Sequence, residues 1–385
     1  MHPSSMTGTS QKTIVSNYLA TIKRGNPTLI KFSKLVGVGA LCAIGAAVLP
    51  SQASAKETLY LLNWSEYMNP AIITQFEKKY DVNVVQNYFG TLGDLYARLQ
   101  AGGVSQFDVI VPSNYYVPRL VHAGLVQPLD KSKLPNLKNI MPKFMNPEYD
   151  PKSQYSVPYQ WGTTGIVYNT KAFPNHPDSW SLLFDPKANP DQPFAMQSDG
   201  NVMVGAACAY LGHSYNCNDR QDWIQAGKLL MQTTGRSNFS GYVDGTPVLD
   251  QLARGTVKAG ISFNGDFLNS RNADPKDFKN LAFFVPKEGG ELWVDTMMIP
   301  AHAPHPDLAY KFINFILDAK VGAELSNWTY YSSPNKAALP YLDKALQESP
   351  SVPSADVMKR VHYLPALDGQ DLMDFQQLWS EVRSH

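Results

Sequence analysis

The alternation of strand-like and helix-like segments constrains the fold of this 385-residue chain more than any other feature. Runs of β-branched and other apolar residues occur at 58–63, 82–86 and 108–111. They alternate with segments that have apolar residues at helical spacing, at 71–79, 92–100 and 117–123. Strands that alternate with helices form mostly parallel sheets, because each helix returns the chain to the edge where the next strand begins. The sequence therefore predicts an α/β fold with mixed, mostly parallel sheets flanked by helices.

The chain changes character twice after this region, and the changes predict two lobes. Residues 151–161 are extended and aromatic, and a second set of elements runs from Ile166 to about Gly290. We expect the first lobe at 56–159 and 293–345, the second lobe at 160–292, and a helical segment at 346–385 that packs on the second lobe. Within these parts, the patterns predict a strand at 293–299 and helices at 306–319 and 370–383. The chain would cross between the lobes near Tyr159 and Gly290, which would form a hinge.

The first 55 residues have the layout of a secretory signal. They contain five basic residues and no acidic one, then an apolar run at 35–50, and then the small residues Ala53-Ser54-Ala55. The apolar run is shorter than the ~20 residues that span a bilayer. We therefore expect cleavage before Lys56 and export to the periplasm. A lipid anchor on Cys42 and an uncleaved membrane anchor are the alternatives.

The composition of residues 56–385 excludes several classes of partner. This part carries 28 Lys and Arg against 33 Asp and Glu, a net charge of about −5, so nucleic acid is not an expected partner. It contains no further apolar stretch long enough to span a membrane, which predicts a soluble mature protein. Cys208 and Cys217 either form a short-loop disulfide or remain two separate thiols, because spacing in the sequence does not define the distance between their Cα atoms.

The sequence contains none of the common local enzyme signatures. It has no His-Glu-x-x-His, no Gly-x-Ser-x-Gly, no phosphate-binding Gly-rich loop with Lys and no Cys-x-x-Cys. His302 and His305 precede a helix that begins with Pro, without nearby acids, and are interpreted as loop residues. We expect no catalytic residue, no metal and no cofactor.

Aromatic residues stand beside acids at the ends of several predicted strands. The sequence has Trp64-Ser65-Glu66-Tyr67 after the first strand, Phe263-Asn264-Gly265-Asp266 after the strand at 259–262, and Trp293-Val294-Asp295 near the second crossing. Ser113 and Tyr115 follow the strand at 108–111, at the carboxyl edge where open α/β sheets bind ligands. An ammonium ion binds to aromatic faces and carboxylates together. Taken singly, each of these motifs is also compatible with core packing or helix capping.

At these residues the chain resembles the spermidine/putrescine-binding proteins of bacterial ABC importers. The resemblance extends through 61–67, 107–116, 157–162, 285–290 and 333–335. It implies a two-lobed periplasmic binding protein fold of type II, a monomer that closes on a polyamine, and an inner-membrane ABC permease as partner.

The resemblance also implies a set of ligand-binding residues. They are Trp64, Ser65, Glu66, Tyr67, Ser113, Tyr115, Asp199, Phe263, Asp266, Trp293, Asp295, Tyr331 and Gln370. Val202 stands where the spermidine-preferring pattern has a Glu, whereas Asp266 matches the putrescine-preferring pattern. The expected ligand is therefore putrescine or spermidine, with a preference for a putrescine-like diamine.

Two further functions remain open at this point. Adjacent tyrosines, Tyr115-Tyr116 and Tyr330-Tyr331, are the kind of phenolate ligands that bind ferric iron in related two-lobed carriers. A periplasmic polyamine sensor that docks on a membrane signalling receptor would have the same sequence features, because a receptor and a permease both recognise the closed lobes.

Overall fold

The structure is a computed structural model that describes residues 55–385. The predicted signal segment lies outside the described residues apart from Ala55. The strands are β1 (Thr58–Trp64), β2 (Asn83–Phe89), β3 (Val109–Ile110), β4 (Val157–Asn169), β5 (Phe194–Gln197), β6 (Phe239–Val243), β7 (Ala259–Phe263), β8 (Leu281–Phe284), β9 (Gly290–Met297) and β10 (Val361–His362). The helices are α1 (Pro70–Tyr80), α2 (Leu92–Gln100), α3 (Val117–His122), α4 (Ser181–Phe184), α5 (Gly200–Tyr210), α6 (Arg220–Thr234), α7 (Pro247–Ala253), α8 (Asn264–Ala273), α9 (Pro306–Ile316), α10 (Ala319–Thr329), α11 (Ala355–Met358) and α12 (Gly369–Ser384).

The first lobe is built on the predicted strand and helix alternation. Its sheet has the order β2-β1-β3, and both pairs of strands are parallel. Helix α1 begins at Pro70 after the cap Asn69, whose side chain accepts from the Ala71 amide, and it buries Phe76 against Phe312 of α9 at 5.1 Å between ring centroids. A helix N-terminus leaves amides without partners, so the cap defines where this helix starts.

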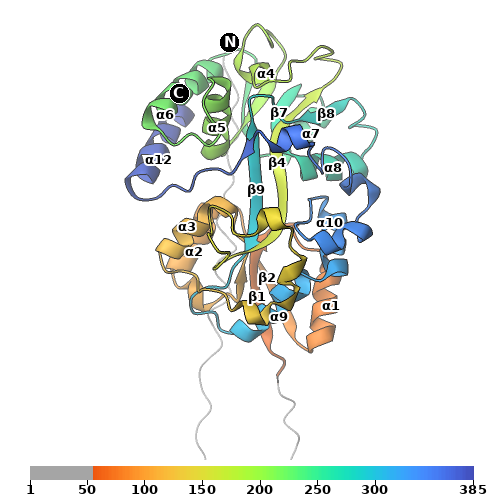
Figure 1. Cartoon of the computed structure of the whole chain (residues 1–385). Helices are drawn as coiled ribbons and strands as arrows, with labels where there is room; N and C mark the ends of the chain where they lie inside the picture. The colour runs from red at the N-terminus through yellow and green to blue at the C-terminus, as the bar shows by residue number, and fades with distance from the viewer. Residues whose placement is uncertain (1–54) are drawn as a thin grey trace, which may run out of the picture. The chain divides into compact units, whose positions relative to one another are not determined.

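The second lobe has a larger mixed sheet with the order β10-β9-β4-β7-β5-β6, and β8 also pairs with β4. The pairs β5-β6, β5-β7 and β9-β10 are parallel, and β4 pairs antiparallel with β7, β8 and β9. Helices α5, α6 and α12 gather beside this sheet at one end of the molecule (Figure 1). The fold is therefore α/β with two lobes.

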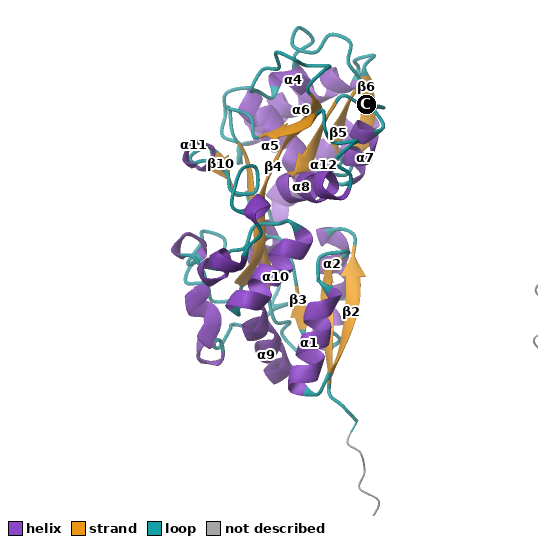
Figure 2. Cartoon of the chain, turned by 90° about the vertical axis from the view of Figure 1, so that its right-hand side faces the viewer, coloured by secondary structure: helices purple, strands orange, loops and turns teal. Residues whose placement is uncertain are grey.

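Strands β4 and β9 connect the lobes. Both run along the long axis through the narrow middle of the molecule, as the two views show (Figures 1 and 2). The first half of β4 pairs with β9, from Val157 opposite Met297 to Thr163 opposite Leu292, and its second half pairs with β7 and β8. Met298, just beyond β9, forms a bridge to Ile110 of the first-lobe sheet. The lobe boundaries predicted at 159/160 and 292/293 fall inside these two strands.

The C-terminal helix α12 packs on α6 of the second lobe. The ring of Phe375 meets Trp223 edge-on at 5.3 Å, and Arg220 forms ion pairs with Asp371 at 3.2 Å and Asp374 at 2.6 Å. Gly200, the first residue of α5, also allows the ring of Trp379 to approach its backbone, since a Cβ there would lie 2.7 Å from the indole. Helix α12 therefore forms part of the wall of the second lobe.

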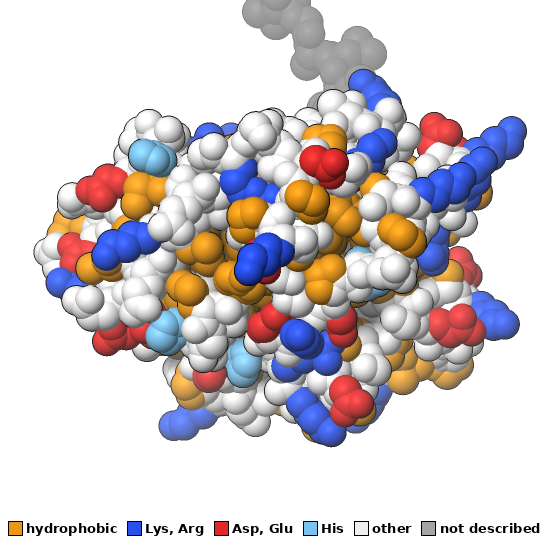
Figure 3. All heavy atoms as spheres, turned by 90° about the horizontal axis from the view of Figure 1, so that it is seen from above, with side chains coloured by type: hydrophobic (Ala, Val, Ile, Leu, Met, Phe, Trp, Pro, Cys, Tyr) orange, Lys and Arg blue, Asp and Glu red, His pale blue; other side chains and the backbone are white. Residues whose placement is uncertain are grey.

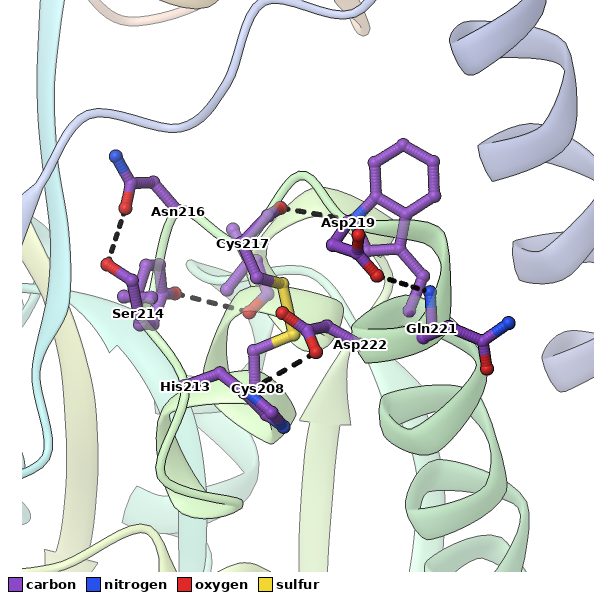
Figure 4. Close-up of a disulfide and its surroundings, with 11 residues drawn as sticks. Cys208, His213, Ser214, Asn216, Cys217, Asp219, Gln221 and Asp222 are labelled. Atoms are coloured by element: carbon purple, nitrogen blue, oxygen red, sulfur yellow. Dashed lines mark hydrogen bonds and ion pairs between the residues drawn. A yellow bond between two sulfur atoms is a disulfide. The ribbon is translucent and has the colours of Figure 1, made fainter.

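Cys208 and Cys217 form a disulfide, which is one of the two alternatives that the sequence leaves open. Their Cα atoms are 6.4 Å apart, and the bridge joins the end of α5 to the segment that leads into α6 (Figure 4). His213 pairs with Asp222 at 3.3 Å beside it. The bridge therefore holds α5 and α6 together at one end.

The surface at the second-lobe end carries intermingled acidic and basic side chains, with apolar side chains between them (Figure 3). Within residues 55–385, none of the helices has both the length and the apolar character that crossing a membrane requires.

Candidate functional site

A cavity of about 1200 Å³ lies between the lobes and brings the predicted residues together. Twelve of the thirteen residues predicted from the sequence line it: Trp64, Ser65, Glu66, Tyr67, Ser113, Tyr115, Asp199, Phe263, Asp266, Trp293, Asp295 and Tyr331. These residues are spread over 268 positions of the chain, and they converge because the loops after β1, β3, β5 and β7 face the two connecting strands. Loops at one edge of a sheet are the usual place for a ligand in α/β folds.

The loop after β1 forms the first wall. Glu66 has a positive φ of 54°, in the left-handed region, and this turn separates Trp64 from Tyr67. The Trp64 ring packs on Phe89 at 4.3 Å between centroids, and the Tyr67 ring packs edge-on against Tyr331 at 5.5 Å. Aromatic packing of this kind restricts the side chains to one orientation.

Asp295 lies deep in the cavity, at the point where the two lobes meet. Its backbone forms an antiparallel bridge with Ser113, and the Ser113 hydroxyl donates to Asp295 Oδ1 at 2.5 Å. The side chain is 7% exposed, and burial raises the pKa of Asp295 to about 6 although the bond from Ser113 lowers it. The hydroxyl of Tyr67 lies beside this carboxylate and also helps to lower its pKa.

The second-lobe wall is linked to the first by Tyr115 and Asp199. Asp199 caps α5 by accepting from the Asn201 amide at 2.8 Å, and Tyr115 Oη donates to its other oxygen at 3.3 Å. The tyrosine follows β3 of the first lobe, whereas the acid follows β5 of the second. This hydrogen bond therefore spans the space between the lobes.

Phe263 and Asp266 come from the junction of β7 and α8. Asp266 accepts hydrogen bonds from the hydroxyls of Thr246 and Tyr331, and burial raises its pKa. The Tyr331 ring lies on the backbone of Gly265, where a Cβ would be 2.1 Å from the ring, so this approach requires glycine. The sequence Phe-Asn-Gly-Asp thus provides an aromatic ring and a carboxylate for the cavity wall, and between them a glycine that leaves room for the Tyr331 ring.

Strand β9 contributes a residue that the sequence analysis missed. Alternate residues of a strand face the same side, and Glu291, Trp293 and Asp295 all line the cavity while Leu292 and Val294 enter the core. Glu291 is 3% exposed and accepts from Thr164 Oγ1 of β4 at 2.5 Å. Burial raises the pKa of Glu291 to about 8, and the charges of Asp199 and Asp295 add to this effect. The period of two along β9 is the signal that could have identified it.

Gln197 is a second residue that was missed. It ends β5, lines the cavity and is 3% exposed, and its Oε1 atom makes no hydrogen bond to a described residue. A buried amide oxygen of this kind can accept from a ligand that donates hydrogen bonds.

The charge of the cavity wall is strongly unbalanced. Its acidic residues are Glu66, Asp199, Asp244, Asp266, Glu291 and Asp295, and its one basic residue is Arg119. The guanidinium of Arg119 stacks on the Tyr96 ring at 3.9 Å and donates to Tyr116. Six carboxylates against one guanidinium, with the rings of Trp64, Phe263 and Trp293 beside them, form an environment for a cation.

Two sequence expectations, the placement of Gln370 in the site and the grouping of the tyrosine pairs, have a different outcome. Gln370 lies at the surface in the first turn of α12, where its amide donates to Asp374, and it does not join the cavity because α12 turns Leu372, Phe375, Gln376 and Trp379 inward instead. Val202 is buried in the cavity wall one turn after Asp199, as its alignment with an acid in the related pattern implies.

Of the two tyrosine pairs considered for ferric iron, Tyr115 and Tyr116 both line the cavity, but the second pair is divided. Tyr331 lines the cavity between the lobes, whereas Tyr330 faces a separate pocket beside α8. Burial raises the pKa values of Tyr115 and Tyr331 well above the ordinary range, which disfavours the phenolate that iron requires.

Two α/β lobes that enclose a polar cavity, with strands shared between them, define a protein that holds a small solute in the cleft. The chain belongs to the family of bacterial extracellular solute-binding proteins, whose family model matches residues 71–354. It is therefore a binding protein and not an enzyme.

Similar proteins are known by sequence and by structure. The putrescine-binding periplasmic protein PotF of Escherichia coli K12 is 33% identical, over 90% of this chain and 96% of that protein. The putrescine/cadaverine-binding protein of Pseudomonas aeruginosa is 32% identical, over 91% of this chain and 99% of that protein. The spermidine/putrescine ABC transporter substrate-binding protein PotD of Streptococcus pneumoniae has a TM-score of 0.74 and 27% identity, and covers 86% of this chain and 99% of its own.

Proposed function

We propose that the protein captures an aliphatic polyamine of the putrescine and spermidine class between its lobes and delivers it to an ABC transporter in the membrane. The observation that carries this proposal is the cavity wall of six carboxylates and one guanidinium. The names of the relatives, which state putrescine, cadaverine or spermidine, support the same ligand class.

The chemistry of the wall suits an ammonium group on a flexible apolar chain. An alkylammonium ion loses its water shell when it enters the cleft, and charge-assisted hydrogen bonds to carboxylates such as Asp295 replace that shell. The methylene groups between the amines need apolar contact, which the faces of Trp64, Phe263 and Trp293 provide. The twelve predicted residues that line the cavity are the proposed ligand contacts, together with Gln197 and Glu291.

Hinge closure couples binding to delivery. The lobes swing about β4 and β9 and bury the polyamine, which lowers the local dielectric and strengthens each ammonium–carboxylate attraction. A ligand with too few amines would leave a buried carboxylate without a partner, which is costly. A micromolar dissociation constant requires about −8 kcal/mol, which two charge-assisted ends and the aromatic contacts supply after ordering costs.

The permease recognises the closed arrangement of the lobes. A signalling receptor would recognise the same shape, and the relatives' description as transporter components favours transport. The protein acts as a monomer in the periplasm after cleavage before Lys56. N-terminal sequencing of the exported protein would show a chain that begins at Lys56.

The direct test is a ligand panel on protein that has been unfolded, washed and refolded to remove bound solute. Putrescine, cadaverine, spermidine and norspermidine are compared by thermal shift and titration calorimetry, with 1,4-butanediol as an uncharged control of matched length. Polyamines should raise the melting temperature and the diol should not, because a ligand that binds only the folded protein stabilises it. The absence of both heat and shift with every polyamine would refute the proposal.

A further inference from the structure

We propose that Glu291 is the second ammonium-binding carboxylate of the cleft, and that a diamine of four or five carbons lies along β9 over Trp293 with one end on Asp295 and the other on Glu291. This inference rests on the proposed polyamine function and identifies the length of ligand that the site prefers. The acid absent at position 202 is thereby supplied from another element of the second-lobe sheet.

The two carboxylates of β9 are held in equivalent ways. Asp295 Oδ1 accepts from the hydroxyl of Ser113, and Glu291 Oε2 accepts from the hydroxyl of Thr164, each at 2.5 Å. Thr164 is the one described side chain that donates to Glu291, and the hydroxyl of Tyr67 lies beside the Asp295 carboxylate and helps to lower its pKa. A hydroxyl thus orients each carboxylate, and both residues line the cavity, which is how a binding group is fixed in advance.

Two of the other four acids of the wall, Asp266 and Asp199, are already engaged in the protein, whereas Glu66 and Asp244 are exposed to solvent. Both oxygens of Asp266 accept hydroxyl donors, from Thr246 and Tyr331. Both oxygens of Asp199 are also in use, by the cap of α5 and by Tyr115. These two acids contribute negative potential, and the buried acids that remain in the wall are Asp295 and Glu291.

The spacing along β9 matches a short diamine. Four residues of a strand separate the Cα atoms of Glu291 and Asp295 by ~13 Å, and Trp293 stands midway between them. Side chains on one face of a strand stand roughly perpendicular to the sheet, so the two carboxylates have about the same separation as their Cα atoms. An extended chain advances ~1.2 Å per bond, so the five bonds of a four-carbon diamine span ~6 Å. Two charge-assisted hydrogen bonds of ~2.8 Å extend this to ~12 Å. A triamine is too long to lie between these two groups alone.

Binding at Glu291 requires the loss of a proton. Around this side chain the titratable groups are Asp199 before α5, Asp295 on β9, Tyr115 after β3, Tyr215 in the disulfide loop, and His362, the register partner of Glu291 on β10. Because burial raises the pKa of Glu291 to about 8, the carboxyl group is mainly protonated in the free protein at pH 7. An ammonium ion that pairs with the carboxylate displaces this proton.

The test compares diamine with monoamine binding in the wild type and in Glu291→Gln. Putrescine and n-butylamine are titrated at pH 7 in two buffers of different ionisation enthalpy, so that affinity and proton release are measured together. In the variant, putrescine affinity should fall at least 30-fold, towards that of butylamine, and proton release should disappear, while butylamine affinity should hardly change. Glu148→Gln, which removes an exposed carboxylate, is the matched control and should behave as wild type.

Glu291→Asp provides a second variant that keeps the charge. It withdraws the carboxylate by one methylene, so the preference should move from putrescine towards cadaverine. Unchanged putrescine affinity in Glu291→Gln, or proton release that persists there, would overturn the inference. A wild type that binds no polyamine would instead refute the proposed function, so the two failures are distinguishable.

Discussion

Replacement of Asp295 by Asn should stabilise the ligand-free protein and weaken polyamine binding at the same time. The amide keeps the size of the side chain and can still accept from Ser113, so the change removes the charge with little change in packing. Burial raises the pKa of Asp295 from 3.8 to about 6, so the folded protein holds this proton more tightly than the unfolded chain does. The contribution of Asp295 to stability therefore falls as the pH rises from about 4 to about 6 and stays low above that.

The magnitude follows from the shift in pKa. A rise of ~2 units corresponds to about 3 kcal/mol, which the variant should regain at pH 7. For about 330 residues, the entropy of unfolding near the midpoint makes this a rise of ~4 °C in Tm. With polyamine present, the wild type should melt at a higher temperature than the variant, because the variant binds the ligand more weakly. Loss of the counter-charge should cost about 2 to 5 kcal/mol of binding free energy, which is a 30-fold or greater fall in affinity.

The assay is thermal unfolding of both proteins between pH 4 and pH 8, with and without putrescine, together with calorimetry at pH 7. Asp277→Asn, which removes an exposed carboxylate, is the control and should change neither property. A ligand-free Asp295→Asn protein that melts below the wild type at pH 7 would contradict the argument from burial. Equal affinity for putrescine would remove Asp295 from the site.

Two other variants test the cavity and the disulfide. Val202→Glu adds an acid one turn from Asp199, so a third ammonium group gains a partner. The ratio of spermidine to putrescine affinity, measured by calorimetry, should therefore rise ~10-fold. Val202→Gln is the neutral control, and an unchanged ratio in Val202→Glu would refute this interpretation. Cys208→Ser with Cys217→Ser opens a loop of about ten residues and should lower the free energy of unfolding by about 2 to 3 kcal/mol in a denaturant titration without changing polyamine affinity. A double variant as stable as wild type would show that the bridge contributes nothing.

The sequence was sufficient to predict the elements that depend on local pattern. The alternation at 58–123 predicts β1 to β3 and α1 to α3 to within a few residues, because each element has its own apolar face and boundary residues. The aromatic and acidic residues at the ends of these strands converge for the same reason, since parallel strands share one carboxyl edge.

The features that the sequence analysis did not predict correctly are set by where elements begin and end and by how they pack together. The sequence analysis does not single out Glu291 because the predicted strand begins at residue 293, whereas β9 begins at Gly290 and its alternation includes Glu291. Gln370 was assigned to the site although the packing of α12 on α6 turns it outward. The disulfide depends on the turn between α5 and α6, which brings Cys208 and Cys217 to 6.4 Å. Each of these is a tertiary property.

Protons and ammonium groups compete for the same two carboxylates of β9, and this competition links stability to specificity. In the ligand-free protein, burial makes the charged forms of Asp295 and Glu291 costly, so both pKa values rise and protons partly neutralise the wall. At pH 7 a diamine of the right length displaces the proton of Glu291 and supplies a counter-charge to Asp295, which is largely ionised at that pH. A monoamine leaves one carboxylate either protonated or unpaired, and thus offsets only part of the free-energy cost of burying the two acids. Discrimination by length therefore follows from the cost of burying each acid.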